Sequence, residues 1–153
     1  MEGNTLFFTE RIKDLYKTSN GKYIAPQAIE MVMSGDQYIE QIAVIGDQRK
    51  FVSALIVPAY SLLEKYAEEK GLAVGSREEL VRNKEVLRLI ETHIEENQKN
   101  LASYEKIKRF TLLSEPFTMG SELTDTLKLR RSVILKKYAD SIEKMYEEAS
   151  NLS

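Results

Sequence analysis

The fold is decided by the stretch Ile39-Glu40-Gln41-Ile42-Ala43-Val44-Ile45-Gly46-Asp47-Gln48-Arg49-Lys50-Phe51-Val52-Ser53-Ala54-Leu55-Ile56-Val57. Its two ends, residues 39–45 and 51–57, are apolar and rich in β-branched side chains, which favour strands. The residues between them are typical of a turn. We therefore predict two adjacent strands at the centre of the core.

A hairpin and a helix are predicted on the N-terminal side of these strands. Asn20-Gly21 separates two short runs, and this dipeptide suits the positive φ angles of a two-residue hairpin turn, so we predict a β-hairpin over residues 15–24. Pro26 predicts the first turn of a helix, because its missing N–H is not needed there, and Gly35 predicts the end of that helix.

The C-terminal side contains mostly helical patterns. We predict helices over residues 60–70 and from Ser76 onward, a strand over 110–113, a polar loop, and one final helix that buries Ile134, Tyr138, Ile142 and Met145. The order of these elements predicts an α+β fold, with a small mixed β-sheet flanked by helices and an N-terminal β-hairpin.

Composition limits the class of protein. A chain of 153 residues that is 42% hydrophobic and 30% charged is typical of one globular domain, here residues 1–153. The absence of cysteine excludes a thiolate nucleophile and a disulfide scaffold, and a net charge of −2 gives no reason to expect a nucleic-acid partner. The N-terminus does not resemble a signal peptide and no apolar run is long enough to span a membrane, so we expect a cytoplasmic protein.

The usual catalytic patterns are mostly missing from the sequence. His93 is the only histidine, which excludes a two-histidine metal site, and we expect it to be structural or merely exposed. We predict no metal site in this chain. The sequence also has no glycine-rich phosphate loop, so a nucleotide pocket would have to come mainly from another domain.

Residues 10–30 carry the first unusual motif. They read Glu10-Arg11-Ile12-Lys13-Asp14-Leu15-Tyr16-Lys17-Thr18-Ser19-Asn20-Gly21-Lys22-Tyr23-Ile24-Ala25-Pro26-Gln27-Ala28-Ile29-Glu30. This resembles the hinge motif of the superfamily that unites acyl-CoA synthetases, luciferases and the adenylation domains of peptide synthetases. The sequence from Lys13 to Pro26 is similar to the sequences of the long-chain fatty-acid branch.

Residues 122–131 carry the second motif, Glu122-Leu123-Thr124-Asp125-Thr126-Leu127-Lys128-Leu129-Arg130-Arg131. It resembles the superfamily's loop that bears the adenylation lysine, whose common form is Thr-x-x-Gly-Lys-Ile-x-Arg. Leu127 stands where that form has glycine. The long-chain branch typically has leucine there, so the departure agrees with the branch assignment.

The resemblance implies a function for the chain. It would be the C-terminal mobile domain of an AMP-forming long-chain fatty-acid–CoA ligase, whose large N-terminal domain would lie outside this chain and bind most of the ATP, the Mg²⁺ and the fatty acid. CoA would be the second substrate. The isolated chain is expected to be inactive, and any peripheral membrane contact would come through the missing domain.

The resemblance also implies roles for individual residues. Lys128 would be the catalytic lysine of the adenylation step, with Arg130 and Arg131 adding positive charge nearby. Lys13 aligns with the hinge about which the domain turns. Arg11 resembles the motif arginine near the adenylate ribose.

Two hairpin residues would serve thioester formation: Gly21, which lets the CoA arm pass, and Lys17. Four assignments have a plainer alternative: an exposed surface charge for Lys128 and Lys13, a salt-bridge partner for Arg11 and a turn glycine for Gly21. For the whole chain, the alternative is a freestanding, non-catalytic interaction module with the same fold.

Overall fold

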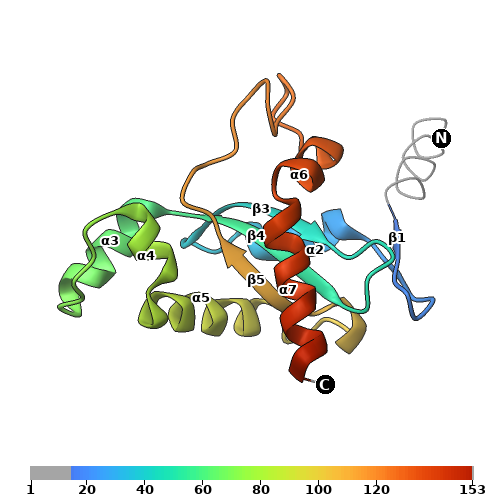
Figure 1. Cartoon of the computed structure of the whole chain (residues 1–153), viewed down its shortest axis with the longest axis horizontal. Helices are drawn as coiled ribbons and strands as arrows, with labels where there is room; N and C mark the ends of the chain where they lie inside the picture. Colours follow the sequence, from blue (N-terminus) through green and yellow to red (C-terminus); the bar gives the residue numbers. More distant parts are fainter. Residues whose placement is uncertain (1–14, 153) are drawn as a thin grey trace.

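A computed structural model describes residues 15–152, with side chains described through Glu147. It contains a three-stranded mixed sheet, a separate two-stranded hairpin and helices packed around the sheet (Figure 1). This confirms the predicted α+β class. The described helices are α2 (Pro26–Ser34), α3 (Tyr60–Glu69), α4 (Arg77–Arg82), α5 (Lys84–Asn97), the 3₁₀ turn η1 (Ser103–Glu105), α6 (Arg131–Lys137) and α7 (Ala139–Leu152).

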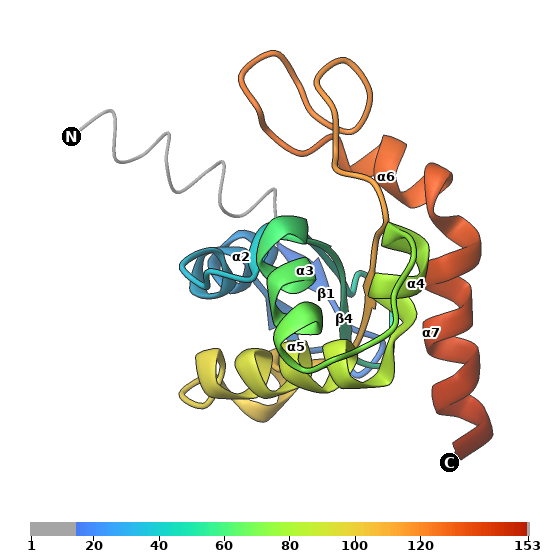
Figure 2. The ribbon, with the colours of Figure 1, turned by 90° about the vertical axis from the view of Figure 1, so that its left-hand side faces the viewer.

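The two predicted central strands are present as β3 (Ile39–Ile45) and β4 (Val52–Pro58). They pair in antiparallel fashion, with Ala43 opposite Leu55. Every residue of β4, the middle strand of the sheet, is buried. Helix α7 covers one face of the sheet and α2 lies on the other (Figure 2). Because both faces are shielded from water, β4 shows no polar–apolar alternation. Its polar residue, Ser53, is buried and donates to the Tyr146 hydroxyl at 2.9 Å.

The third strand, β5 (Ile107–Leu112), runs parallel to β4 at the edge of the sheet. It begins earlier than the predicted strand over 110–113. The side chain of Gln98 fixes this start, because the Ile107 N–H donates to Gln98 Oε1 at 2.8 Å and Gln98 Nε2 donates to the Ile107 carbonyl at 3.2 Å. An edge strand tolerates polar residues, so Lys108 and Arg109 hid the start of β5 from a pattern based on apolar runs.

The predicted final helix is two helices. The chain leaves helical geometry at Tyr138, where φ is −108° and ψ is 23°, between α6 and α7. The spacing of Ile134, Ile142 and Met145 still places all three side chains in the core. The prediction was therefore correct for these three residues, whereas Tyr138, also predicted to be buried, is only partly so. The break was missed because no glycine or proline marks it.

The predicted hairpin is confirmed, with β1 (Tyr16–Lys17) antiparallel to β2 (Tyr23–Ile24). Ile24 is buried and lies against the turn between β3 and β4, where its Cδ1 would be 3.1 Å from a Cβ added at Gly46. The hairpin is thus packed onto the sheet. None of the described helices is long and apolar enough to cross a bilayer.

Candidate functional site

Lys128 lies on the segment that connects β5 to α6, residues 113–130, which we call the lysine loop. The lysine loop extends away from the sheet and the helices (Figures 1 and 2). Its first part is fixed to the sheet, since Phe117 is buried and its N–H donates to Gln41 Oε1 on β3 at 2.8 Å. The Lys128 side chain itself is exposed. The loop therefore has a fixed base and presents an ammonium group to its surroundings.

A tight turn positions Lys128. The Leu127 N–H donates to the Thr124 carbonyl at 2.9 Å, and the Thr124 N–H donates to the Lys128 carbonyl at 2.8 Å. The Lys128 N–H donates to Thr124 Oγ1 at 3.1 Å. Leu127 closes the turn with a φ of 63°, in the left-handed region that non-glycine residues rarely adopt. The common glycine of this motif would adopt that φ freely.

The hairpin between β1 and β2 repeats this turn. The Gly21 N–H donates to the Thr18 carbonyl at 2.9 Å, the Thr18 N–H donates to the Lys22 carbonyl at 2.8 Å, and the Lys22 N–H donates to Thr18 Oγ1 at 3.1 Å. Within this turn, only Gly21 has a left-handed backbone conformation, with a φ of 83°. The prediction of a two-residue turn at Asn20-Gly21 was therefore wrong: the loop has three residues, 19–21, and glycine is needed at one position.

Glu122 anchors the base of the lysine loop. Its carboxylate is fully buried and accepts hydrogen bonds from the N–H of Thr118 at 3.1 Å, from the hydroxyl of Tyr138 at 3.1 Å and from the ammonium of Lys137. Burial alone would raise the pKa of the Glu122 carboxyl, but these donors outweigh it and lower the pKa to about 2. The same carboxyl group raises the pKa of Tyr138, which burial also raises.

The sequence motifs did not reveal this role for Glu122. The one available signal was an acidic residue standing among Leu, Thr and Ser side chains just before the motif threonine. That residue is ionised and buried because α6 supplies Lys137 and the break before α7 supplies Tyr138. The loop is therefore tied to the helix that follows it.

Arg131 does not add free positive charge beside Lys128, as the motif had suggested. Its guanidinium makes two hydrogen bonds with the Glu30 carboxylate, of 2.9 and 2.8 Å, and is mostly buried. Burial would lower the pKa of Arg131, but the bonds to Glu30 raise it above its usual value. Glu30 also accepts a hydrogen bond from the Val44 N–H at 2.8 Å. Arg130 remains exposed, and its N–H donates to the Glu122 carbonyl at 2.7 Å.

The two sequence motifs meet at this ion pair. Glu30 ends the first motif and Arg131 ends the second. The Arg131 guanidinium also lies 5.8 Å from the ring centroid of Tyr16, on the hairpin, and burial raises the pKa of that phenol. The Tyr16 hydroxyl donates to the Val44 carbonyl at 3.3 Å. These contacts join four elements next to the end of the lysine loop: the hairpin, α2, β3 and α6.

The remaining predicted site residues are not gathered around Lys128. Lys17 is exposed on the hairpin, with its ammonium 5.6 Å from the Tyr23 ring centroid. The hairpin and the lysine loop occupy separate parts of the molecule in Figure 1. A Cβ added at Gly21 would meet no other atom within 4 Å, so its backbone φ is the only local demand for glycine. Arg11 and Lys13 lie outside the described residues.

His93 is a structural partner of Asp36. Its Nδ1 lies 2.7 Å from Asp36 Oδ2, and its ring meets that of Tyr38 edge-on. Bonds from the Tyr38 N–H, from Asn97 and from His93 lower the pKa of Asp36, although burial alone would raise it. Within the described residues, no group of three or more His, Cys, Asp or Glu side chains could hold a metal ion.

This geometry leaves two exposed cations, Lys128 and Arg130, on an anchored loop. Such a group can neutralise an anion that another surface brings against it. Other charges nearby are already used, because Arg131 is paired with Glu30 and Glu122 with Lys137. A site built on Lys128 would therefore need a partner surface to complete it.

Comparison with protein families finds one matching family model, described as the AMP-binding enzyme C-terminal domain, which covers residues 13–150. Among curated proteins, long-chain-fatty-acid–CoA ligase 5 of Mus musculus is 34% identical over 151 residues, which is 96% of this chain and 22% of that protein. Long chain acyl-CoA synthetase 8 of Arabidopsis thaliana is 32% identical over 141 residues, or 90% of this chain and 20% of that protein. The chain thus spans about a fifth of these relatives.

Solved structures show the same fold. The adenylation domain of the carboxylate reductase of Mycobacterium chelonae has a TM-score of 0.72 and 28% identity over 90% of this chain and 20% of that one. The corresponding domain from Segniliparus rugosus, in complex with AMP and a co-purified carboxylic acid, has a TM-score of 0.73 and 24% identity over 91% of this chain and 20% of that one.

Proposed function

We propose, from the premise that this chain belongs to the family of AMP-binding enzyme C-terminal domains, that it is the mobile domain of a long-chain fatty-acid–CoA ligase. Its identity with ligases and synthetases of this kind extends over nine tenths or more of the chain. The observation that carries the proposal is Lys128, an exposed lysine on an anchored loop at the position of the adenylation motif.

The proposed reaction has two steps. A carboxylate oxygen of the fatty acid attacks the α-phosphorus of ATP, and pyrophosphate leaves as the acyl-adenylate forms. The sulfur of CoA then attacks the acyl carbonyl carbon, AMP leaves, and the thioester remains after the thiol has lost its proton. The first step brings a carboxylate and a triphosphate together, so it needs positive charge at the reacting centre.

Lys128 supplies that charge in our proposal. Its anchored turn holds the backbone while the side chain stays free to reach an anion on the N-terminal domain. The lysine loop moves with the body of the domain, because Glu122 joins it to Lys137 and Arg131 joins α6 to Glu30. Rotation of the whole domain would therefore withdraw Lys128 without unfolding the loop.

The hairpin would act in the second step. Lys13 would be the pivot and Arg11 would lie near the ribose, as the motif implies. Lys17 is exposed and Gly21 has open space around it, and both features allow the hairpin to lie against CoA. The separation of the hairpin from the lysine loop supports two alternating positions of the domain, one for each step.

The partners follow from the same proposal. The large N-terminal domain would hold the fatty acid, most of the ATP, and Mg²⁺ bound to the phosphates, since the described residues contain no carboxylate cluster for a metal. A cytoplasmic location, and membrane contact through the N-terminal domain, stay predictions.

The proposal is tested by comparing three proteins: the complete ligase, its N-terminal domain alone, and this chain alone. With oleate, ATP and CoA, only the complete ligase should release AMP and form oleoyl-CoA above background. A complete protein that folds but makes no acyl-CoA would refute the proposed ligase activity. Full activity of the N-terminal domain without this chain would favour the freestanding interaction module.

A further inference from the structure

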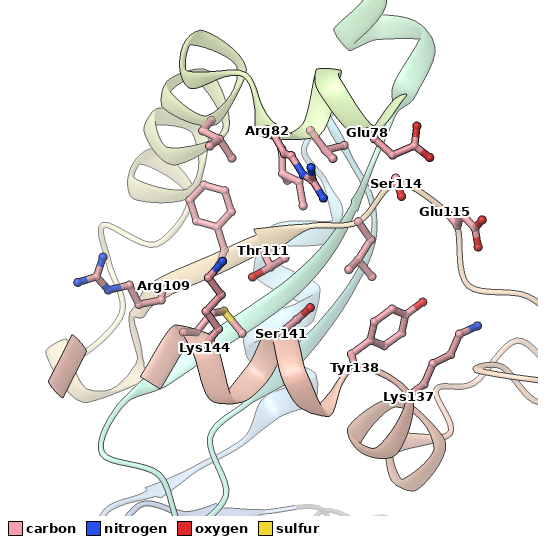
Figure 3. A pocket seen from close by; sticks show the side chains of 16 residues that line it. Glu78, Arg82, Arg109, Thr111, Ser114, Glu115, Lys137, Tyr138, Ser141 and Lys144 are labelled. Carbon is pink, nitrogen blue, oxygen red and sulfur yellow. The ribbon is translucent and has the colours of Figure 1, made fainter. Parts of the chain in front are cut away.

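A pocket of about 570 Å³ lies at the free edge of β5, between α4 and α7 (Figure 3). We call it the edge pocket. Of the lysine loop, only its first residues up to Glu115 line the edge pocket, so Lys128 is not part of it. Its volume falls in the range of small-molecule sites, about 300–1,000 Å³. No role assigned above uses this pocket.

Polar side chains from three elements enter the edge pocket. Arg82 comes from α4, Thr111 from β5, and Ser141 and Lys144 from α7 (Figure 3). None of these four side chains has a hydrogen-bond or ion-pair partner among residues 15–147, where side chains are described. Lys137, which also lines the pocket, differs because its charge is taken by Glu122. Arg109 and Ser114 also line the pocket without such a partner among the described side chains, so the pocket gathers three cations and three hydroxyl groups that the fold leaves unpaired.

The wall behind these groups is apolar. It includes the Phe110 ring on β5, Val81 on α4 and Met145 on α7. Leu112 and Val81 are buried, whereas Phe110 is only partly buried and keeps some exposed ring surface. A ligand bound here would therefore meet hydrogen-bond donors on one side and an apolar surface on the other.

The donors suit one compact anion. Arg and Lys with Ser and Thr hydroxyls are the side chains that commonly bind phosphate oxygens, and a tetrahedral phosphate can accept from several of them at once. Glu78 and Glu115 also line the pocket, which disfavours a second anionic group there. The net charge of the chain is −2, so the attraction for an anion is local to these side chains.

We propose that the edge pocket binds a phosphate monoester with an aromatic or apolar body, held by Arg82 and Lys144 with Thr111 and Ser141. This chemistry is shared by a nucleoside monophosphate and by a lipid phosphate. The inference does not depend on the ligase proposal, because it needs neither Lys128 nor a second domain.

Binding is tested on the 153-residue chain by titration calorimetry and by amide chemical shifts. The probes are AMP, a short-chain lysophosphatidate, inorganic phosphate and decanoate. AMP or lysophosphatidate should bind more tightly than inorganic phosphate, shift the amides of Thr111 and Ser141, and bind more weakly as salt is added. The stronger of these two probes identifies the body that the apolar wall prefers.

Variants separate the edge pocket from general charge. Arg82→Gln and Lys144→Gln should each weaken binding of the stronger probe by about tenfold or more, because each removes a charged donor. Lys65→Gln removes the same charge from an exposed side chain on α3, outside the pocket lining, and should leave affinity unchanged. Unfolding midpoints of all three variants check that each is folded.

Several results would overturn the proposal. One is the absence of shifts at Thr111 and Ser141 with both esters at millimolar concentration. Another is affinity that Arg82→Gln and Lys144→Gln leave unchanged. Decanoate binding as tightly as the esters would replace the phosphate ligand with a carboxylate amphiphile, and equal loss with Lys65→Gln would show only nonspecific charge attraction.

Discussion

The turn at residues 18–22 and the turn at residues 124–128 have the same backbone construction. Each begins with a threonine whose carbonyl and hydroxyl oxygens accept two N–H groups, and each ends at a lysine. They differ at the left-handed position, which is Gly21 in the hairpin and Leu127 in the lysine loop. The same turn therefore occurs twice, once with the residue that suits it and once with a residue that does not.

The two turns also differ in what supports them. The hairpin turn is bound to the turn between β3 and β4, through the Ser19 N–H to the Arg49 carbonyl at 2.9 Å and the Gln48 N–H to the Lys17 carbonyl at 2.8 Å. The lysine loop is supported at its base by the buried charge of Glu122. The comparison shows that the turn alone does not single out Lys128, the lysine that we propose to be catalytic. Lys22 is exposed as well, so the two lysines differ in the sequence motif around Lys128 and in its anchor, the buried Glu122.

The largest difference should appear when each turn loses its lysine. In the complete ligase, Lys128→Ala should slow acyl-adenylate formation by about 10²–10³, the usual cost of removing one preorganised charge-stabilising group. Lys22→Ala, the matched change in the other turn, should leave this step near its normal rate. Single-turnover assays of adenylate formation measure both, and equal slowing by the two variants would contradict the assignment of Lys128.

The anchor of the lysine loop should have the next largest effect. Glu122→Gln keeps the shape of the side chain and removes the charge that Lys137 and Tyr138 bind, so the free energy of unfolding should fall by about 1–3 kcal/mol. Urea denaturation of the chain measures this change. Glu115→Gln, on an exposed side chain nearby, is the control and should change it little. An unchanged stability in Glu122→Gln would show that the carboxylate is no anchor.

The same carboxyl group predicts a pH dependence. Its pKa in the folded chain is about 2, below the usual 4.5, so the stability it contributes is present above about pH 4.5 and is lost as pH falls toward 2. Asp36 has a lowered pKa as well and adds to the loss. The free energy of unfolding, measured from about pH 6 to about pH 2.5, should therefore decline less steeply for Glu122→Gln than for the unmodified chain. Identical slopes of unfolding free energy against pH in the two proteins would argue against an ionised pair between Glu122 and Lys137.

The left-handed positions should give the smallest effects, with opposite signs. Gly21→Ala places a side chain at a φ of 83° and should cost about 1–2 kcal/mol, although no atom lies near the added Cβ. Leu127→Gly removes similar strain, but glycine gains about 0.5–1 kcal/mol of freedom in the unfolded chain, so a small net stabilisation is expected. Thermal unfolding compares the two. A destabilised Leu127→Gly would show that the exposed leucine has a packing role.

Much of the fold could be predicted from local patterns. The runs around Ile42 and Leu55 could be predicted as strands because they are apolar and rich in β-branched residues. Pro26 begins α2 as expected. The start of β5 and the break at Tyr138 could not be predicted from local apolar runs. Gln98, on another element, bonds the backbone at the first, and the Glu122 carboxylate accepts from the Tyr138 hydroxyl at the second.

The site was predictable in one part only. The motif predicted that Lys128 lies on a loop, and the structure places it there; its catalytic role stays a prediction. The pair formed by Glu30 and Arg131 spans 101 positions, so no local pattern could place those two side chains together. The charge of Arg131 was therefore expected to be free, whereas Glu30 neutralises it.

The central claim is that one rigid domain alternates between two positions, and its most direct test uses the hinge. Proline at residue 13 fixes φ near −65° and removes no group proposed to contact ATP. In the complete ligase, Lys13→Pro should still form acyl-adenylate but transfer the acyl group to CoA poorly, whereas Lys13→Ala should be milder. Separate assays of the two steps give the answer, and normal thioester formation in a folded Lys13→Pro enzyme would contradict a domain that must turn.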